Sequence, residues 1–261
     1  MFDFSNQSVI VTGGTKGVGL GITHAFLAAG AKVFICGRNA PENMPTVDNN
    51  SAIFIAADVR KEEATQALID AVVEQTGRLD VLVNNAGGSP PVAAADAPTK
   101  LTEAIIKLNL IGPMIFAQQA YHAMKKTAGG GSIINIASVS GVRPSPGTAA
   151  YGAAKAGLIN VSRSLAQEWG VDNVRVNAII AGLIKTEAAE EHYAGEAGIK
   201  LIEDSLPMKR MAIPDDIANA CLFLAAESSK YVSGAALEVY GGGEPPSFLK
   251  MAEDAYALQN K

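Results

Sequence analysis

The chain has 261 residues, a length that suits one large α/β domain or two small ones and allows a sizeable buried core. Hydrophobic residues make up 48% of it and charged residues 18%, which excludes a disordered chain. The net charge of −5, without a cluster of lysine and arginine, argues against a nucleic-acid partner. The sequence shows no signal-peptide pattern, and no apolar run reaches the roughly 18–20 residues that cross a bilayer. We therefore expect a cytoplasmic protein that contacts no membrane.

Cysteine and histidine are too scarce to indicate a metal site. Cys36 and Cys221 are the only cysteines, and the three histidines lack the spacing of metal ligands. We expect no bound metal, and we expect both cysteines to be buried small hydrophobic residues.

Short apolar runs alternate along the chain with stretches that read as helices. The runs predict strands at 8–12, 32–36, 52–56, 80–83, 132–137, 174–180 and 236–240. The helices are expected at 17–29, 61–76, 100–127, 149–169 and 214–227. Strands that are apolar on both faces and alternate with helices indicate a parallel sheet covered on both sides. We predict an α/β fold with a single domain over residues 1–261, a doubly wound (Rossmann) sheet of about seven strands.

Two segments interrupt this alternation. Residues 39–51 lie where a crossover helix is expected, but Pro41 and Pro45 predict a loop or at most one turn. Residues 185–210 are mixed in character and come late in the sheet, where a mobile cover over a ligand would belong. We expect this second segment to cover the substrate.

The first strand runs directly into the glycine-rich turn TGGTKGVG, residues 12–19. Its glycines would let the backbone approach a pyrophosphate, whose charge the amides and dipole of the next helix stabilise. A turn that serves only chain reversal is the alternative, but the place between first strand and first helix favours a dinucleotide. The predicted cofactor contacts in this turn are Gly13, Thr15, Lys16, Gly17, Val18 and Gly19.

The end of the second strand indicates which dinucleotide binds. A site that prefers NAD usually presents a carboxylate there, to bind the ribose 2′-hydroxyl. This strand ends with Arg38 and has no acid, and Lys16 adds a second positive charge nearby. A guanidinium attracts a 2′-phosphate, so NADP(H) is preferred while NAD(H) stays possible. Alternatively, Arg38 is a solvated loop residue.

Three further features follow in chain order: NNAG at residues 84–87, Ser138 after the fifth strand, and Tyr151 four positions before Lys155. With the glycine turn, in this order and spacing, they resemble the short-chain dehydrogenase/reductase family from Ser5 to about Gly243. The resemblance implies an enzyme that interconverts a ketone and a secondary alcohol by hydride transfer to or from a nicotinamide dinucleotide, without a metal.

Tyr151 and Lys155 lie one helical turn apart, so their side chains enter the same space. A free phenol has a pKa of about 10 and is a poor base at neutral pH. An ammonium about 5 Å away, at an effective dielectric near 20, would lower the pKa of Tyr151 by about two units. This predicts that Tyr151 is the general acid and base. The alternative is a core or interface tyrosine.

Two more residues complete the predicted catalytic group. Ser138 lies at the carboxyl edge of the sheet, where its hydroxyl can donate to a carbonyl oxygen; Ser140 is a nearby rival. The resemblance assigns to Asn109 a kink in the long helix and a water that links Lys155 to solvent.

The resemblance also assigns cofactor contacts outside the glycine turn. Besides Tyr151 and Lys155, which hold the ribose side, they are Asp58, Val59, Asn85, Ala86, Gly87, Ile136, Ile184 and Thr186. The sequence departs from the family at Ala181, where a proline is usual, which leaves the backbone after it less restrained.

A second departure is residues 244–261, which extend beyond the family's usual C-terminus. The apolar residues in this tail suggest that it docks, over a neighbouring subunit's site; a frayed surface tail is the alternative. The resemblance implies a homo-oligomer, a tetramer or dimer, with a dimer face on the helices at 100–127 and 149–169.

The substrate is a small carbonyl or alcohol compound whose identity the sequence leaves open. Residues 88–98, 139–148 and 185–210 should line its pocket, and their small, apolar character indicates a bulky hydrophobic ketone or alcohol. One alternative is a reductase of a 3-oxoacyl thioester, on acyl-carrier protein or CoA. Another is a non-catalytic, cofactor-sensing protein, which would be expected to have lost Ser138, Tyr151 or Lys155.

Overall fold

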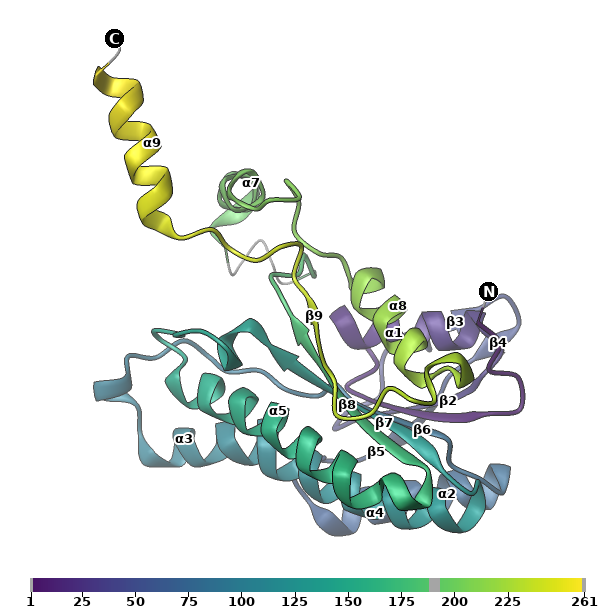
Figure 1. Cartoon of the computed structure of the whole chain (residues 1–261). Helices are drawn as coiled ribbons and strands as arrows, with labels where there is room; N and C mark the ends of the chain where they lie inside the picture. Colours follow the sequence, from purple (N-terminus) through teal and green to yellow (C-terminus); the bar gives the residue numbers. More distant parts are fainter. Residues whose placement is uncertain (1, 188–192, 260–261) are drawn as a thin grey trace.

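The computed structural model describes residues 2–187 and 193–259 and is built around one sheet (Figure 1). Seven strands, all parallel, lie in the order β5-β2-β1-β6-β7-β8-β9. They are β1 (Ser8–Thr12), β2 (Lys32–Gly37), β5 (Ile53–Ala56), β6 (Val81–Asn84), β7 (Gly131–Ser138), β8 (Val174–Ala181) and β9 (Ala236–Val239). The predicted doubly wound sheet is confirmed.

Helices cover both faces of the sheet (Figure 1). Those that pack on it are α1 (Gly17–Ala28) and α8 (Pro214–Ala225) on one face, and α2 (Glu62–Thr76), α4 (Gly112–Thr127) and α5 (Ala149–Trp169) on the other. Successive strand residues enter opposite cores: Val9 and Val11 contact the α1 and α8 side, and Ile10 the α2 and α4 side. This double burial explains why the strands are apolar at nearly every position.

The strand order reverses between β1 and β6, whose neighbours on the far sides are β2 and β7. In an open parallel sheet the crevice outside the carboxyl ends at such a point is where ligands bind. The fold therefore brings the ends of β1, β6 and β7, with the residues that follow each strand, to one place.

Both cysteines lie in the core, as predicted. Cys36 on β2 and Cys221 on α8 are fully buried free thiols, and burial raises the pKa of Cys36 to about 12. Among the described residues, no group of three potential metal ligands comes together. None of the described helices is long and apolar enough to span a membrane.

Residues 39–51 hold no helix, as the prolines predict, but they are more ordered than a loop. They form a two-stranded antiparallel hairpin of β3 (Thr46–Val47) and β4 (Asn50–Ser51), turned at Asp48, which has a φ of 51°. The Asn50 amide donates to the carbonyls of Leu27 and Ala31 at 3.1 and 3.0 Å, so the hairpin caps the end of α1. Sequence pattern did not show these long-range bonds.

The long helix expected at 100–127 has three parts. α3 (Thr99–Ile106) and α4 are joined by a π-helical turn at Lys107–Ile111, centred on Asn109. One extra residue per turn is accommodated there, which is a common device for placing a functional side chain. The helix is therefore irregular at Asn109, where the kink was predicted.

Two helices lie beyond the carboxyl end of the sheet (Figure 1). α7 (Gly195–Ser205) occupies part of the predicted cover, and residues 188–192 of that segment lie outside the described residues. α9 (Ser247–Gln259) forms most of the C-terminal tail and projects away from the sheet, with Phe248, Met251 and Leu258 about two-thirds exposed or more. The tail is therefore helical, and its docking stays a prediction.

Candidate active site

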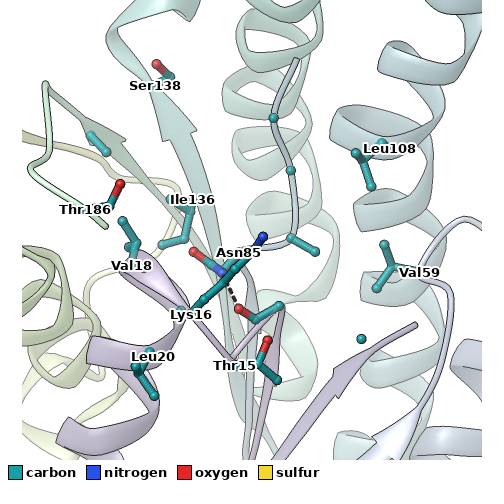
Figure 2. A pocket seen from close by; sticks show the side chains of 18 of the residues that line it. Thr15, Lys16, Val18, Leu20, Val59, Asn85, Leu108, Ile136, Ser138 and Thr186 are labelled. Atoms are coloured by element: carbon teal, nitrogen blue, oxygen red, sulfur yellow. Dashed lines mark hydrogen bonds between the residues drawn. The ribbon is translucent and has the colours of Figure 1, made fainter. Parts of the chain in front are cut away.

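A cleft of about 1010 Å³ lies at the carboxyl edge of the sheet. Every residue that the sequence assigned to the cofactor lines it: Gly13, Thr15, Lys16, Gly17, Val18, Gly19, Arg38, Asp58, Val59, Asn85, Ala86, Gly87, Ile136, Tyr151, Lys155, Ile184 and Thr186. In Figure 2, Lys16 and Asn85 lie near its centre, with Val59 on one side and Thr186 on the other. The volume is at the upper end of the range for small-molecule sites, so a dinucleotide fits.

The glycine turn brings backbone to the floor of this cleft. Gly13 and Gly17 have φ of 65° and 52°, in the left-handed region that favours glycine. A Cβ at Gly19 would lie 2.1 Å from the carbonyl oxygen of Gly13, so the start of α1 packs directly on the turn. Such a cradle, followed by a helix N-terminus, suits a pyrophosphate.

Side-chain hydrogen bonds tie this turn to the next strand. The Thr12 hydroxyl accepts from the backbone amides of Asn85 and Ala86, each at 2.9 Å. The side-chain amide of Asn85 donates to the Thr12 carbonyl at 2.9 Å. The carboxyl ends of β1 and β6 are therefore fixed to each other, and so is the NNAG segment that lines the cleft.

Basic side chains gather where β2 and β5 end. Lys16 and Arg38 are exposed at the cleft, and no acidic residue stands immediately after β2. Asp58 accepts from Arg60 Nε and Nη2 at 2.8 and 2.7 Å, and this pairing lowers the pKa of Asp58 to about 2. Arg60 thus adds a guanidinium to this end of the cleft. Sequence reasoning missed it because nothing in the pattern separates it from a solvated helix-start residue.

Tyr151 and Lys155 project from the first turns of α5 into the other end of the cleft. The Lys155 ammonium lies 5.5 Å from the centre of the Tyr151 ring. Lys155 is only 3% exposed and donates to the Ile136 carbonyl on β7 at 2.7 Å. Burial lowers the pKa of Lys155 to about 8. The i,i+4 pairing is confirmed.

The predicted effect on the phenol is wrong in direction. Burial raises the pKa of Tyr151, and hydrogen bonding by Ser138 offsets this only in part. The charge of Tyr193 raises it further. The prediction counted the attraction of Lys155 for a phenolate but not the desolvation of the phenol in its cleft. The protein's own residues therefore keep Tyr151 protonated at neutral pH.

Ser138, not Ser140, faces the tyrosine. Ser138 lines the cleft, and its oxygen accepts from the Ser140 backbone amide at 3.2 Å, which leaves its hydroxyl hydrogen to donate towards Tyr151. The Ser140 hydroxyl instead accepts from Ser145 at 3.1 Å. The position of Ser138 at the carboxyl edge of the sheet was thus a sufficient signal.

Asn109 lies behind the cleft wall and does not line it. Its buried amide bonds the backbone of Gly88 in both directions at 2.9 Å and donates to the Ile105 carbonyl at 2.9 Å. A Cβ on Gly87 would lie 2.6 Å from Asn109 Oδ1 and 3.3 Å from Lys155 Nζ. Gly87 therefore marks the point where Asn109 and Lys155 approach each other, as the resemblance implied; the water between them stays a prediction.

The small residues around Tyr151 have packing reasons. A Cβ on Gly152 would lie 2.8 Å from the Ser140 carbonyl, and one on Gly157 would lie 3.0 Å from Leu110. The helix surfaces on either side of Tyr151 and Lys155 are therefore packed, one against the loop after β7 and the other against the π-helical turn, while the two side chains enter the cleft.

Known proteins are similar to this chain in sequence, and a solved structure is similar to it in fold as well. The family model described as enoyl-(acyl carrier protein) reductase matches residues 13–244. A protein of Rhizobium meliloti named a probable galactose dehydrogenase is 35% identical over 92% of this chain and 96% of its own. A 3-oxoacyl-[acyl-carrier-protein] reductase of Chlamydia muridarum is 34% identical over 91% and 97%. A crystal structure from Sinorhizobium meliloti described as a short-chain alcohol dehydrogenase has a TM-score of 0.83 and 33% identity, covering 92% and 97%.

Proposed function

The chain belongs to the short-chain dehydrogenase/reductase family, and from this premise we propose that it interconverts a ketone and a secondary alcohol with NADP(H). One observation carries the proposal: Ser138, Tyr151 and Lys155 lie together near the end of β7. They line the same cleft as the glycine turn. All three would be dispensable in a cofactor-sensing protein, which is the reason to prefer an enzyme.

Each of the three side chains has a distinct task. Bound NADP(H) supplies or accepts the hydride. Ser138 donates to the substrate oxygen as negative charge develops on it, and Tyr151 gives or takes the proton. Lys155, held by the Ile136 carbonyl, keeps two more N–H groups with which to bind the ribose. Because Tyr151 is protonated at neutral pH, the protein is prepared for the reduction of a carbonyl compound.

The cofactor preference rests on charge at the end of β2. Lys16 and Arg38 would present an ammonium and a guanidinium to a 2′-phosphate, and no carboxylate stands at the end of β2 to bind a ribose hydroxyl. Arg60 adds charge beside them, although Asp58 shares it. NAD(H) remains possible in the same cleft.

The relative that reduces 3-oxoacyl thioesters keeps that substrate class as the second candidate. Its chemistry is the same hydride and proton transfer, so the catalytic residues do not separate the two. No basic patch that would hold an acidic carrier stands out in the sequence, which favours a free small molecule. A homo-oligomer and a cytoplasmic location stay predictions.

The test is the Tyr151→Phe variant, with NADPH absorbance followed over a panel of carbonyl compounds. We expect turnover to fall roughly 10²–10⁴-fold while NADPH binding is unchanged, because only the proton donor is lost. Tyr231→Phe is the matched control, since that side chain is fully exposed. Undiminished turnover in Tyr151→Phe would refute the proposed role of the phenol. NADPH binding by the wild type without turnover of any compound would favour a sensor.

A further inference from the structure

Three loops are bonded to one another next to the start of α5, which carries Tyr151. The first is the segment after Ser138, where the short 3₁₀ turn Val139–Gly141 leads to Arg143, whose amide donates to the Val139 carbonyl at 3.0 Å. The second is residues 88–98, tied to the first by a bond of 2.7 Å from the Val92 amide to the Gly147 carbonyl. The third follows β9 and carries Glu244. Two of these loops are ones that the sequence assigned to the substrate.

Arg143 and Glu244 join the first and third loops by a two-point ion pair. Arg143 Nη2 lies 2.6 Å from Glu244 Oε1, and Nε lies 2.5 Å from Oε2. The side chains are 40% and 30% exposed, so they are neither buried in the core nor free in solvent. The pair bridges chain positions 101 residues apart, and Arg143 belongs to the segment 139–148 that the sequence assigned to the substrate pocket.

The backbone around Glu244 is built to bring it there. Gly241, Gly242 and Gly243 have φ of 66°, 91° and 79°, a run of left-handed residues that glycine adopts readily and other residues do not. A Cβ on Gly242 would lie 3.3 Å from Pro207, which follows α7. The run therefore turns the chain sharply after β9, under the cover segment and towards Arg143.

Packing contacts place the pair beside the cleft. A Cβ on Gly182, which lines the cleft, would lie 2.6 Å from Tyr240, and one on Gly243 would lie 2.5 Å from the Tyr240 ring. Glu244 therefore follows a residue that packs on the cleft wall. Burial raises the pKa of Tyr193, the Glu244 carboxylate raises it further, and the Arg143 guanidinium lowers it. The charge of Tyr193 in turn raises the pKa of Tyr151. A substrate whose carbonyl meets Tyr151 would therefore extend out of the cleft towards Arg143 and Glu244.

Both partners keep hydrogen-bonding capacity after pairing. A guanidinium has five N–H groups, of which Arg143 gives two to Glu244 and one to the Pro144 carbonyl at 3.1 Å. A carboxylate has about four acceptor positions, of which the pair uses two. The pair carries no net charge, so it can both donate to and accept from hydroxyl groups without favouring an anion.

We propose that Arg143 and Glu244 form a polar clamp that selects a neutral, polyhydroxylated substrate, a sugar or polyol, by binding hydroxyl groups remote from the reacting carbon. This inference rests on the proposed oxidoreductase function and specifies its substrate class. One hydroxyl donates to Glu244 while a neighbouring one accepts from Arg143. An acidic substrate is disfavoured because Glu244 both repels it and occupies the guanidinium. A polyhydroxylated substrate thus takes the place of the bulky hydrophobic ketone or alcohol that the composition of the loops alone indicates.

The experiment compares the wild type with Glu244→Ala and Arg143→Ala, and with Glu227→Ala as control, since Glu227 forms only an exposed ion pair with Lys230. Oxidation of D-threitol and D-galactose is measured with each dinucleotide beside oxidation of cyclohexanol, and thermal melting checks folding. We expect kcat/KM for the two polyhydroxylated compounds to fall roughly 10–100-fold in both clamp variants. Turnover of cyclohexanol should match the wild type, because the reacting centre is untouched.

A third probe separates recognition from a structural role. Glu244→Ala frees the Arg143 guanidinium, so oxidation of the acidic sugar D-galacturonate should improve in that variant and not in Arg143→Ala. Wild-type oxidation of cyclohexanol but not of polyhydroxylated compounds would overturn the clamp and leave the proposed function standing. Unchanged kinetics in both clamp variants would also overturn it. Failure of the wild type on every alcohol and carbonyl compound would overturn the proposed function, and the clamp with it.

Discussion

The two halves of the cleft are held together in different ways. The cofactor half rests on bonds between adjacent strand ends, such as those from the amides after β6 to Thr12, which is only 1% exposed. The substrate half rests on loops joined by the partly exposed pair of Arg143 and Glu244. Buried backbone bonds tolerate little change, whereas exposed pairs contribute modestly and exchange partners easily. The first half therefore fixes where hydride transfer occurs, and the second can vary what reaches it.

The largest effect should come from closing the cofactor cradle. A Cβ at Gly19 would lie 2.1 Å from the Gly13 carbonyl oxygen, a backbone atom that cannot move aside without opening the turn. We expect Gly19→Ala to weaken NADPH binding more than about 100-fold, equivalent to roughly 3 kcal/mol of lost hydrogen bonding to the pyrophosphate. Fluorescence titration with NADPH measures it. If the variant bound NADPH as tightly as the wild type, the glycine turn would open at little cost, and the cofactor half would not be the rigid half of the cleft.

The next effect concerns the charged end of the same half. Arg38→Asp replaces a guanidinium with a carboxylate, which would repel a 2′-phosphate and accept from a ribose hydroxyl. We expect NADPH affinity to fall about 100-fold, or roughly 3 kcal/mol, with NADH affinity equal or better. Lys230→Asp, on the surface remote from the cleft, controls for the change in net charge. A wild type that already prefers NADH would show that the phosphate interpretation is wrong.

A third test measures how much the burial of the charged Lys155 side chain lowers the unfolding free energy. Burial lowers the pKa of Lys155 from its ordinary 10.5 to about 8, so the folded protein binds this proton more weakly than the unfolded chain. The unfolding free energy should therefore rise with pH through the window from about 8 to 10.5. Lys155→Met removes this term. We expect the variant's stability relative to the wild type to be about 2 kcal/mol higher at about pH 7 than at about pH 9.5.

Urea unfolding of both proteins at the two pH values gives that difference, and every titration outside Lys155 cancels in the comparison. The variant should lack turnover at either pH. An unchanged stability difference would mean that Lys155 is solvated in the folded protein, contrary to its 3% exposure.

The cofactor half is also the half that sequence predicts well. Its residues lie at strand ends or within two residues of them, at Gly13, Asp58, Asn85 and Ser138, so correct strand ends are enough to bring them together. The i,i+4 spacing likewise placed Tyr151 and Lys155 on one face of α5. What sequence could not supply was the balance between desolvation and charge, which sets the direction of the pKa of Tyr151.

The substrate half was harder to predict because its contacts join distant loops. Arg143 and Glu244 are separated by 101 residues, and neither belongs to a regular pattern. The loop of Arg143 could be assigned to the pocket, but Glu244 was assigned to the C-terminal tail, and the pairing of the two depends on the turn after β9. The hairpin at Thr46–Ser51 shows the same limit, since its anchoring bonds from Asn50 reach the end of α1.

The smallest expected effect tests that turn. Gly242 has a φ of 91°, and an alanine there is strained whatever the space around it. We expect Gly242→Ala to lower the unfolding free energy by about 1 kcal/mol and to weaken recognition of polyhydroxylated substrates, because Glu244 shifts away from Arg143. Gly170→Ala is the matched control. Gly170 has a φ of −58° with nothing within 4 Å of an added Cβ, so alanine should stabilise the protein by about 0.4–1 kcal/mol. Urea unfolding measures the change in unfolding free energy for both variants. Changes of opposite sign would show that backbone conformation, and not the loss of a glycine as such, holds the substrate half. Equal losses of stability in the two variants would contradict this.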